Sequence, residues 1–566
     1  ARDVESRTFP EPLLTVRVAP GCPGAVRVAT SSMEDQVRLN EGVICLSHFP
    51  VDSRYARGEL LRPVAHGGDD VPHSLLHSLP PEVKRLVFAR LDASELTALC
   101  CTGHEIRAQT EEILSNLFLQ RWASARVSAC SKFTSSVQCL GGPSRDKWSA
   151  RYGQMERAET SLLTGSAIPC SFLDGRLPED DQHVLEADLA ISPTLVVAVC
   201  SASMWNAMNM WRGDLPAAPT DTVMIWRLSD GTALGPLVLP SDPTGEHAPV
   251  VRVHEATVFV AEAGAWDVRT WNLGDAGLEP GANVQGHTGA VKSMCVDDAL
   301  LASGSMDGTA RVCNHSTQTT LIIAQHLGPV TEVQLTAGRL ATQSLRPGGG
   351  EETCLWDVTT GARLAIWDGW PCIAPLAARV YVQGEVQLEA HDLPSLREGQ
   401  RMSHPREEAS YSSALVSSAR YVLAALSDDE SDVEGWWVAV WCAEGGELRG
   451  YLGPHPWEVE SMLLVGHAAL CFAFDSHPAQ IYIWDLRKLP DGAGSPIRLR
   501  LDAPMLAVGL AGSSLALALS TGAVVLCDLS CTSESEPADG SPPLRVVADK
   551  SPANATHVPG DEACAS

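Results

Sequence analysis

The sequence predicts a mainly β fold in which one small antiparallel sheet is repeated along the chain, preceded by a short helical region. Three observations lead to this prediction. Residues 286–314 contain three short apolar segments separated by turn residues, which is the pattern of a β-meander. Segments ending in Trp-Asp, or in a variant of it, recur at a nearly constant interval. Within residues 73–122, apolar residues are instead spaced as on one face of a helix.

The repeat is clearest at the end of the third strand of each sheet. The residues at this position are Trp226, Trp271, Cys313, Trp356, His391, Trp441, Trp484 and Cys527. The intervals between them are 45, 42, 43, 35, 50, 43 and 43 residues. An interval of about 40–45 residues is typical of WD-repeat blades, so residues 167–530 resemble the WD-repeat β-propeller family. Eight repeats predict eight blades, and seven is the alternative if the fifth repeat forms no blade of its own.

The resemblance also implies structural roles for individual residues. The tetrad of the family (His, Ser or Thr, Asp, Trp) matches the third repeat at His287, Ser303 and Asp307, with Cys313 in place of Trp. Gly466-His467 looks like the same signature, but it falls between the first and second strands of its repeat, so we interpret it as a turn. The eighth repeat lacks an outer strand, and we expect residues 169–173 to supply it and close the ring.

Composition and charge exclude several classes of function. The net charge of −28 disfavours nucleic acids and anionic membranes as partners. No apolar run reaches the roughly 18 residues of a membrane span, and no secretory signal is visible. The 17 cysteines contain no CxxC pair. We therefore expect reduced thiols and a location in the cytoplasm, the nucleus or both. Residues 1–70 and 531–566 are polar and aperiodic, and we expect them to be mostly disordered.

Residues 73–122 carry the helical pattern. Leu79, Val83 and Leu86 lie on one helical face, Pro80 suits the first turn, and a third helix is expected over 106–122. The series resembles the F-box, a module that docks on the Skp adaptor of cullin–RING ubiquitin ligases. The resemblance implies adaptor contacts for Leu79, Pro80, Glu82, Val83, Leu86, Val87, Leu91, Leu96 and Leu99. The alternative is an ordinary helical domain that caps the propeller. Residues 123–165 are expected to form a helical linker.

No motif for catalysis, for a cofactor or for a metal is recognisable, so we expect a binding protein and not an enzyme. Long loops at one rim of the propeller are the candidate binding elements. Some of these loops carry aromatic or cationic side chains, namely Trp205, Trp211, Arg212, Trp266 and Arg346. Another loop carries the acidic residues Asp428, Asp429 and Glu430. Large aromatic residues are typical interface anchors. The alternatives are that the aromatic loop folds onto its blade and that the acidic loop is a solvated insertion.

Together the two resemblances imply the substrate-recognition subunit of an SCF-type cullin–RING ligase, with the F-box on the adaptor and the propeller on a protein substrate. The competing prediction is a WD-repeat scaffold without a ligase role. The acidic loop and the net charge favour a substrate segment that is basic and apolar over a phosphorylated one.

Overall fold

The structure is a computed structural model that describes residues 14–18, 26–30, 36–39, 42–45, 104–122, 124–128, 148–166, 168–173, 186–201, 220–240, most of 249–530, and 546–547. The gaps within 249–530 are 275–276, 298, 318, 337, 374–378, 385–387, 394–399, 403–409, 428–434, 474–479, 492–493 and 502. The chain divides into two compact units, residues 1–118 with 144–153, and residues 119–143 with 154–566. No helix in the described part is both long enough and apolar enough to cross a membrane.

Among its described residues, the first unit contains two hairpins and parts of two helices. Strand β1 (Leu14–Val18) pairs with β2 (Val26–Thr30), and β3 (Gln36–Leu39) pairs with β4 (Gly42–Cys45). The sequence predicts mostly disorder here, whereas short alternating runs such as that of β1 pair locally. Helix α4 (His104–Trp122) covers the third predicted helix. The first two predicted helices, with all nine F-box residues from Leu79 to Leu99, lie outside the described residues.

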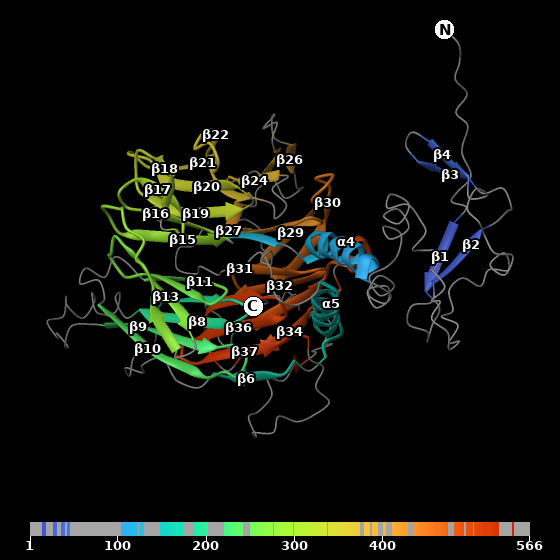
Figure 1. The fold of residues 1–566 in the computed structure, drawn as a ribbon, viewed down its shortest axis with the longest axis horizontal. Coiled ribbons are helices and arrows are strands. Elements are labelled where there is room, and N and C mark those ends of the chain that lie inside the picture. Colours follow the sequence, from blue (N-terminus) through green and yellow to red (C-terminus); the bar gives the residue numbers. More distant parts are fainter. Residues whose placement is uncertain are drawn as a thin grey trace, which may run out of the picture. The chain divides into compact units, whose positions relative to one another are not determined.

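The second unit contains eight antiparallel sheets arranged as an eight-bladed β-propeller (Figure 1). The first strands of neighbouring blades adjoin, as β7 does with β11 and β35. Blades 1 to 4 are built from β7 (Glu186–Ile191), β8 (Leu195–Ser201), β9 (Thr220–Arg227) and β10 (Ala233–Pro240); β11 (Val250–His254), β12 (Thr257–Ala261), β13 (Val268–Gly274) and β14 (Gly277–Pro280); β15 (Val291–Asp297), β16 (Leu300–Ser305), β17 (Thr309–Asn314) and β18 (Thr319–Gln325); and β19 (Val330–Thr336), β20 (Arg339–Leu345), β21 (Glu351–Asp357) and β22 (Arg363–Trp367).

The remaining blades follow the same order from the inner to the outer strand. Blades 5 to 8 are built from β23 (Trp370–Ile373), β24 (Arg379–Gln383), β25 (Leu388–Asp392) and β26 (Gln400–Met402); β27 (Ser410–Ser418), β28 (Tyr421–Ser427), β29 (Trp436–Cys442) and β30 (Leu448–His455); β31 (Ser461–Val465), β32 (Ala468–Ala473), β33 (Gln480–Asp485) and β34 (Ile497–Arg500), with a 3-10 turn η3 (Leu486–Asp491); and β35 (Met505–Ala511), β36 (Ser514–Leu519) and β37 (Val524–Asp528). The prediction of eight blades is confirmed, because the weak fifth repeat forms a sheet of its own.

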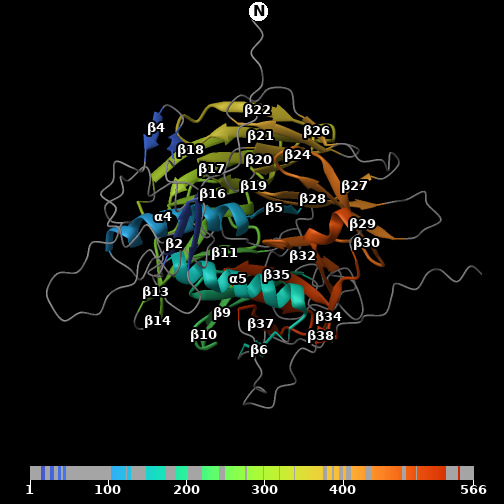
Figure 2. The ribbon, with the colours of Figure 1, turned by 90° about the vertical axis from the view of Figure 1, so that its right-hand side faces the viewer.

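The outer strand of blade 8 comes from the start of the propeller sequence. Strand β6 (Cys170–Phe172) pairs antiparallel with β37, and Figure 2 shows the two strands side by side. Backbone hydrogen bonds extend the pairing at both ends, from Leu173 N to Val524 O (3.0 Å) and from Asp528 N to Pro169 O (3.1 Å). The predicted closure of the ring by residues 169–173 is confirmed.

Two further strands were not predicted. Strand β5 (Ser124–Ser128) pairs with β27 as a fifth strand on the inner edge of blade 6, and it adjoins β23 and β31. Strand β38 (Val546–Val547) pairs with β34 on the outer edge of blade 7. The expected helical linker 123–165 is therefore a strand followed by helix α5 (Trp148–Thr164), among its described residues. Residues 124–128 alternate polar and apolar types over too short a run to be recognised as a strand.

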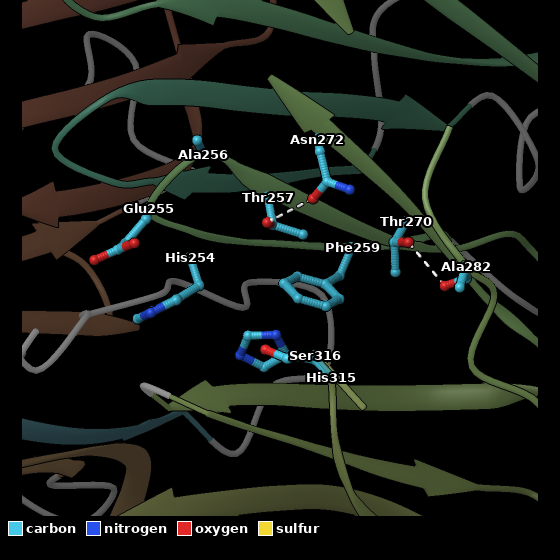
Figure 3. A pocket seen from close by; sticks show the side chains of 10 residues that line it. All are labelled: His254, Glu255, Ala256, Thr257, Phe259, Thr270, Asn272, Ala282, His315 and Ser316. Carbon is cyan, nitrogen blue, oxygen red and sulfur yellow. Dashed lines mark hydrogen bonds between the residues drawn. The ribbon is translucent and has the colours of Figure 1, made fainter. Parts of the chain in front are cut away.

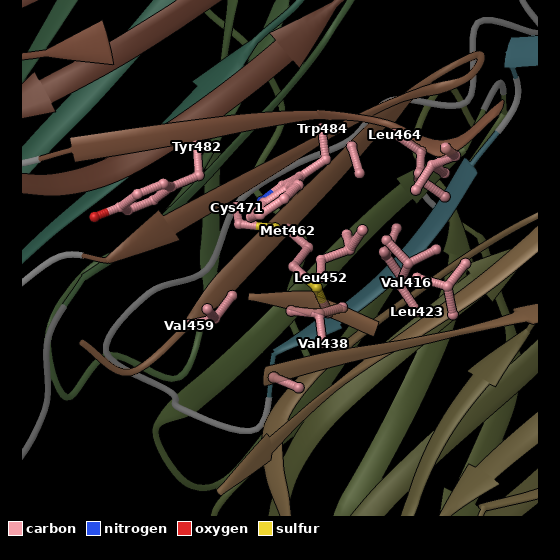
Figure 4. Close-up of a cluster of buried hydrophobic side chains, with 14 of the residues drawn as sticks. Val416, Leu423, Val438, Leu452, Val459, Met462, Leu464, Cys471, Tyr482 and Trp484 are labelled. Atoms are coloured by element: carbon pink, nitrogen blue, oxygen red, sulfur yellow. The ribbon is translucent and has the colours of Figure 1, made fainter. Parts of the chain in front are cut away.

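The blades pack on one another through side chains of their first, second and third strands. Figure 4 shows the cluster between blades 6 and 7, in which Leu423 and Val438 face Met462, Cys471 and Trp484. Trp484 is 3% exposed, and Trp226 and Trp441 are fully buried in equivalent clusters. Trp356 is also buried and Trp271 half-buried. Burying one such side chain contributes about 1.5–3 kcal/mol, so the repeated tryptophans stabilise the contacts between blades.

A buried carboxylate holds the C-terminal part of α5 to the propeller. Glu159 is 2% exposed. Its Oε2 accepts hydrogen bonds from Arg121 Nε (3.1 Å) and Trp122 Nε1 (3.0 Å), and its Oε1 accepts one from the backbone N of His467 (3.0 Å). Gly466 and His467 form the turn between β31 and β32, so the interpretation of this pair as a turn is confirmed. The acceptor oxygens of a buried carboxylate need such donors, and here the donors come from a helix and from a blade.

Candidate protein-binding rim

One rim of the propeller carries a row of exposed apolar side chains on blades 2 to 4. They come from the turns between second and third strands and from a crossing between blades. Trp266 is 57% exposed, Met306 41%, Leu327 84% and Leu345 43%. We call these four residues the apolar rim. Single exposed apolar residues are common on proteins, whereas four of them on one rim make that rim a candidate interaction surface.

Backbone hydrogen bonds tie the loops of the apolar rim into one continuous ledge. The bonds run from Val291 N to Ala265 O (3.1 Å), from Met306 N to Ala290 O (2.9 Å), from His326 N to Gly308 O (2.9 Å) and from Leu345 N to Pro329 O (3.0 Å). Each crossing loop is thus bonded to the turn of a neighbouring strand pair. A rigid ledge lowers the entropy cost of binding, because its side chains are already in place.

A polar network beneath Met306 fixes the turn of blade 3. His287 bonds Ser303 Oγ through Nε2 (2.8 Å) and Asp307 through Nδ1 (3.1 Å). Asp307 also accepts hydrogen bonds from the backbone N of Thr288 and of Thr309, both at 2.8 Å. Burial acts to raise the pKa of Asp307, but these hydrogen-bond donors outweigh it and lower that pKa to about 2. Burial of the His287 ring lowers the pKa of His287. The three predicted tetrad residues are therefore brought together.

Blade 4 has a corresponding network that the sequence analysis missed. His326 bonds Thr342 Oγ1 through Nε2 (2.9 Å) and Ser344 Oγ through Nδ1 (3.0 Å), and Trp356 Nε1 donates to Thr342 Oγ1 (2.9 Å). The segment from His326 to Val330 matches His287 to Val291 at His, Gly and Val, and this match was the available signal. Blade 4 has the Trp of the tetrad but not the Asp. Asp307 follows Ser305 by two residues in blade 3, and the equivalent position two residues after Ser344 in blade 4 is Arg346.

The charged groups next to the apolar rim are mostly paired. Arg346 lies 2.5 Å from Asp368 and 3.6 Å from Glu352, and Arg269 lies 2.7 Å from Glu262. Burial raises the pKa of Glu262, and Arg269 acts in the opposite direction. Arg346, predicted as a rim contact, is therefore engaged with two carboxylates of its own chain, whereas Trp266 is presented as expected.

The other predicted rim residues cannot be placed in this surface. Trp205, Trp211, Arg212, Asp428, Asp429 and Glu430 all lie outside the described residues. Sequence analysis in turn missed Met306, Leu327 and Leu345. Met306 lies in a turn, Leu327 in a crossing between blades and Leu345 at the end of β20, and the exposure of each depends on which side of the sheet the chain leaves there.

One group of side chains in the described part of the chain has donor atoms suited to a metal ion. Donor atoms of His326, Glu352 and Cys354 lie within 4.8 Å of one another. Both ring nitrogens of His326 already have hydrogen-bond partners, Thr342 and Ser344, and Arg346 lies beside Glu352. Burial raises the pKa of Cys354 to about 12, which disfavours the thiolate that binds metals. We therefore assign these residues to the structural network of blade 4.

A pocket of about 580 Å³ opens between blades 2 and 3 (Figure 3). His315 packs edge-on against Phe259, with 5.4 Å between ring centroids, and lies 5.9 Å from the ring of His254. Thr257 donates to Asn272 (2.8 Å) and Thr270 to the carbonyl of Ala282 (2.8 Å). The size suits a small molecule, and the hydroxyl groups of Thr257 and Thr270 already donate to groups of the chain itself.

Comparisons with known proteins identify no family. No family model matches the chain, and no curated protein matches it. Among solved structures, the crystal structure of the computationally designed Ika8 protein matches with a TM-score of 0.44 and 17% sequence identity. The match covers 64% of this chain and 96% of that one. The assignment of the propeller therefore depends on the strand order and pairing described above.

Proposed function

We propose that this chain is a protein-interaction scaffold that binds a partner through the apolar rim. The observation that carries the proposal is the row formed by Trp266, Met306, Leu327 and Leu345 on one hydrogen-bonded ledge. Trp residues, together with Met, are enriched at protein interfaces. The first strands of the blades hold the ledge rigid, so that the partner supplies most of the adaptation.

The partner segment that best suits this surface is apolar and basic. The net charge of −28 favours a cationic approach, whereas Glu262, Glu352 and Asp368 beside the apolar rim are already paired with Arg269 and Arg346. The net charge already includes Asp428, Asp429 and Glu430. Because surface charges act mainly on the rate of association, binding should weaken as salt is added.

The role we propose for this interaction is substrate recognition in a cullin–RING ubiquitin ligase of the cytoplasm or nucleus. The support is the resemblance of residues 79–99 to the F-box, which implies a Skp adaptor as second partner. Ubiquitin transfer would belong to the partner enzymes, and this chain would contribute proximity. The alternative is a scaffold that binds proteins through the same rim without a ligase. Neither role involves nucleic acid, a membrane or a cofactor.

The rim is tested by comparing charged substitutions on and off the apolar rim. Met306→Asp and Leu327→Asp should each reduce proximity labelling of the partner in cells by about tenfold or more, which corresponds to the loss of an interface anchor. Leu321→Asp and Ile366→Asp are matched controls, since these side chains are 52% and 44% exposed on the outer strands β18 and β22. Equal labelling by the rim variants and the controls would contradict the proposed surface.

The ligase role is tested separately by the adaptor. Leu79→Ala combined with Pro80→Ala should abolish co-purification of the Skp adaptor while the propeller stays folded and still labels its partner. If the wild-type chain fails to retain the adaptor but the rim variants still lose their partner, the scaffold alternative is correct.

A further inference from the structure

Two cysteines face each other across the strand pair that closes the ring. Cys170 is the first residue of β6, and Cys527 lies in β37, the third strand of blade 8. Their Cα positions are direct partners in the antiparallel register. Side chains of directly opposite residues project from the same face of a sheet. Both residues are free cysteines, with Cys170 half-buried and Cys527 buried.

The hydrogen-bond pattern determines which kind of pair they form. The pairs on either side of them, Pro169 with Asp528 and Leu173 with Val524, are joined by backbone hydrogen bonds. Hydrogen-bonded and non-hydrogen-bonded pairs alternate along an antiparallel ladder. Cys170 and Cys527 therefore occupy a non-hydrogen-bonded pair, in which the Cα atoms lie about 4.5 Å apart. This separation lies within the range of about 4.4–6.8 Å found in disulfides.

We propose that Cys170 and Cys527 form a reversible disulfide that covalently closes the propeller. The bond would join the N-terminal closing strand to the last blade, so that the ring could no longer open at its single non-covalent junction. The described cysteines are free thiols, and in this pair the fold, and not sequence proximity, brings the two residues together.

The chemistry requires an oxidant, for which a small-molecule disulfide such as oxidised glutathione is sufficient. The Cys170 thiolate attacks one sulfur of the oxidant, forms a mixed disulfide and releases one thiolate. The Cys527 thiolate then attacks the Cys170 sulfur of the mixed disulfide and releases the second small-molecule thiolate. In total, two protein thiols and one small-molecule disulfide give one protein disulfide and two small-molecule thiols. Cys170 is the first nucleophile because it is the more exposed of the two. The hydrogen bond with Cys170 and burial raise the pKa of Cys527, which makes Cys527 the weaker nucleophile.

The experiment uses the full chain equilibrated in buffers of defined reduced and oxidised glutathione, followed by thiol blocking and non-reducing tryptic mapping. Peptide 158–176 contains Cys170 as its only cysteine, and peptide 501–545 contains Cys527 and Cys531. We expect a cross-linked species that joins these two peptides and disappears on reduction. Oxidation should raise the Tm by about 3 °C or more, because the bond closes a very long loop.

Three variants separate the proposal from its alternatives. Cys170→Ser and Cys527→Ser should each abolish the cross-link and the rise in Tm, while under reducing conditions both variants should melt close to the wild type. Cys531→Ser, the matched control, should retain both effects. The proposal is overturned if no cross-link forms in oxidised glutathione, or if the cross-link persists in Cys527→Ser and disappears in Cys531→Ser.

Discussion

At the scale of single residues, Asp307 fixes the turn that presents Met306 in the apolar rim. Its carboxylate accepts hydrogen bonds from the backbone of Thr288 and Thr309 and from the hydroxyl of Thr309 (2.7 Å), and it contacts His287. One residue thereby joins the crossing loop before blade 3 to the turn that presents Met306. The sequence predicted this network, because His, Ser and Asp occur at the family spacing.

Replacing Asp307 by Asn should destabilise the propeller by about 1–3 kcal/mol, since buried donors lose their charged acceptor. The pKa of Asp307 lies at about 2, below the ordinary value of 3.8. A group with a lowered pKa stabilises the folded state above its unfolded pKa, and this contribution is lost as the pH falls through the folded pKa. The difference in unfolding free energy between wild type and Asp307→Asn should therefore be constant above pH 5 and shrink from about pH 4 towards pH 2.

Denaturant unfolding at a series of pH values measures this difference. Asp368→Asn is the control, because that side chain is 79% exposed and contacts Arg346 at the surface. It should change the unfolding free energy by less than about 1 kcal/mol at every pH. A pH-independent difference for Asp307→Asn would show that the carboxylate charge is not what stabilises the turn.

At the scale of elements, the contact of α5 with blade 7 depends on a glycine. Gly466 has φ of +62°, and a Cβ atom there would collide with the carboxylate of Glu159. His467, next in the turn, bonds Tyr421 OH through Nδ1 (2.8 Å) and lies 3.0 Å from Arg420 through Nε2, so blade 6 joins the same network. Sequence analysis recognised the turn but not this contact, since Glu159 lies 308 residues away from His467.

Gly466→Ala should therefore destabilise the protein more than an ordinary substitution of a turn glycine. Gly512 is the matched control, because it has φ of +59° in the corresponding turn of blade 8 with nothing within 4 Å of an added Cβ. Both variants incur left-handed backbone strain of about 1–2 kcal/mol. Only Gly466→Ala adds a collision, which should cost a further 1–3 kcal/mol, about the usual cost of overpacking.

Hydrogen exchange of residues 154–164 distinguishes the two variants. Exchange in this part of α5 should accelerate in Gly466→Ala and remain as in the wild type in Gly512→Ala. Equal unfolding free energies and equal exchange in the two variants would show that Glu159 moves aside at little cost, and that α5 does not depend on this turn.

At the scale of the whole molecule, the repeated four-stranded sheets were predictable from the sequence, whereas the extra strands β5 and β38 were not. Eight sheets follow from eight recurring strand ends, because each sheet repeats one local pattern. The roles of β5 and β38 depend instead on pairing with strands far away in the sequence, as Leu415 does with Val127 and Leu499 with Val546. Short segments carry too little periodicity to indicate such partners. The apolar rim was predicted only at Trp266, because the exposure of a turn residue depends on the neighbouring blade.

The closing strand gives the last prediction. Ser171 pairs with Leu526 between the two non-hydrogen-bonded positions of β6, so its backbone N–H belongs to a hydrogen-bonded pair. Ser171→Pro removes this donor and should detach β6, because a proline in a paired strand interrupts the ladder. The edge of β37 would then be exposed, and we expect a lower Tm together with aggregation that increases with protein concentration. Ser171→Thr keeps the N–H and should behave as the wild type. Scanning calorimetry with light scattering under reducing conditions measures both effects, and an unchanged, monomeric Ser171→Pro would mean that the ring stays closed without this strand pair.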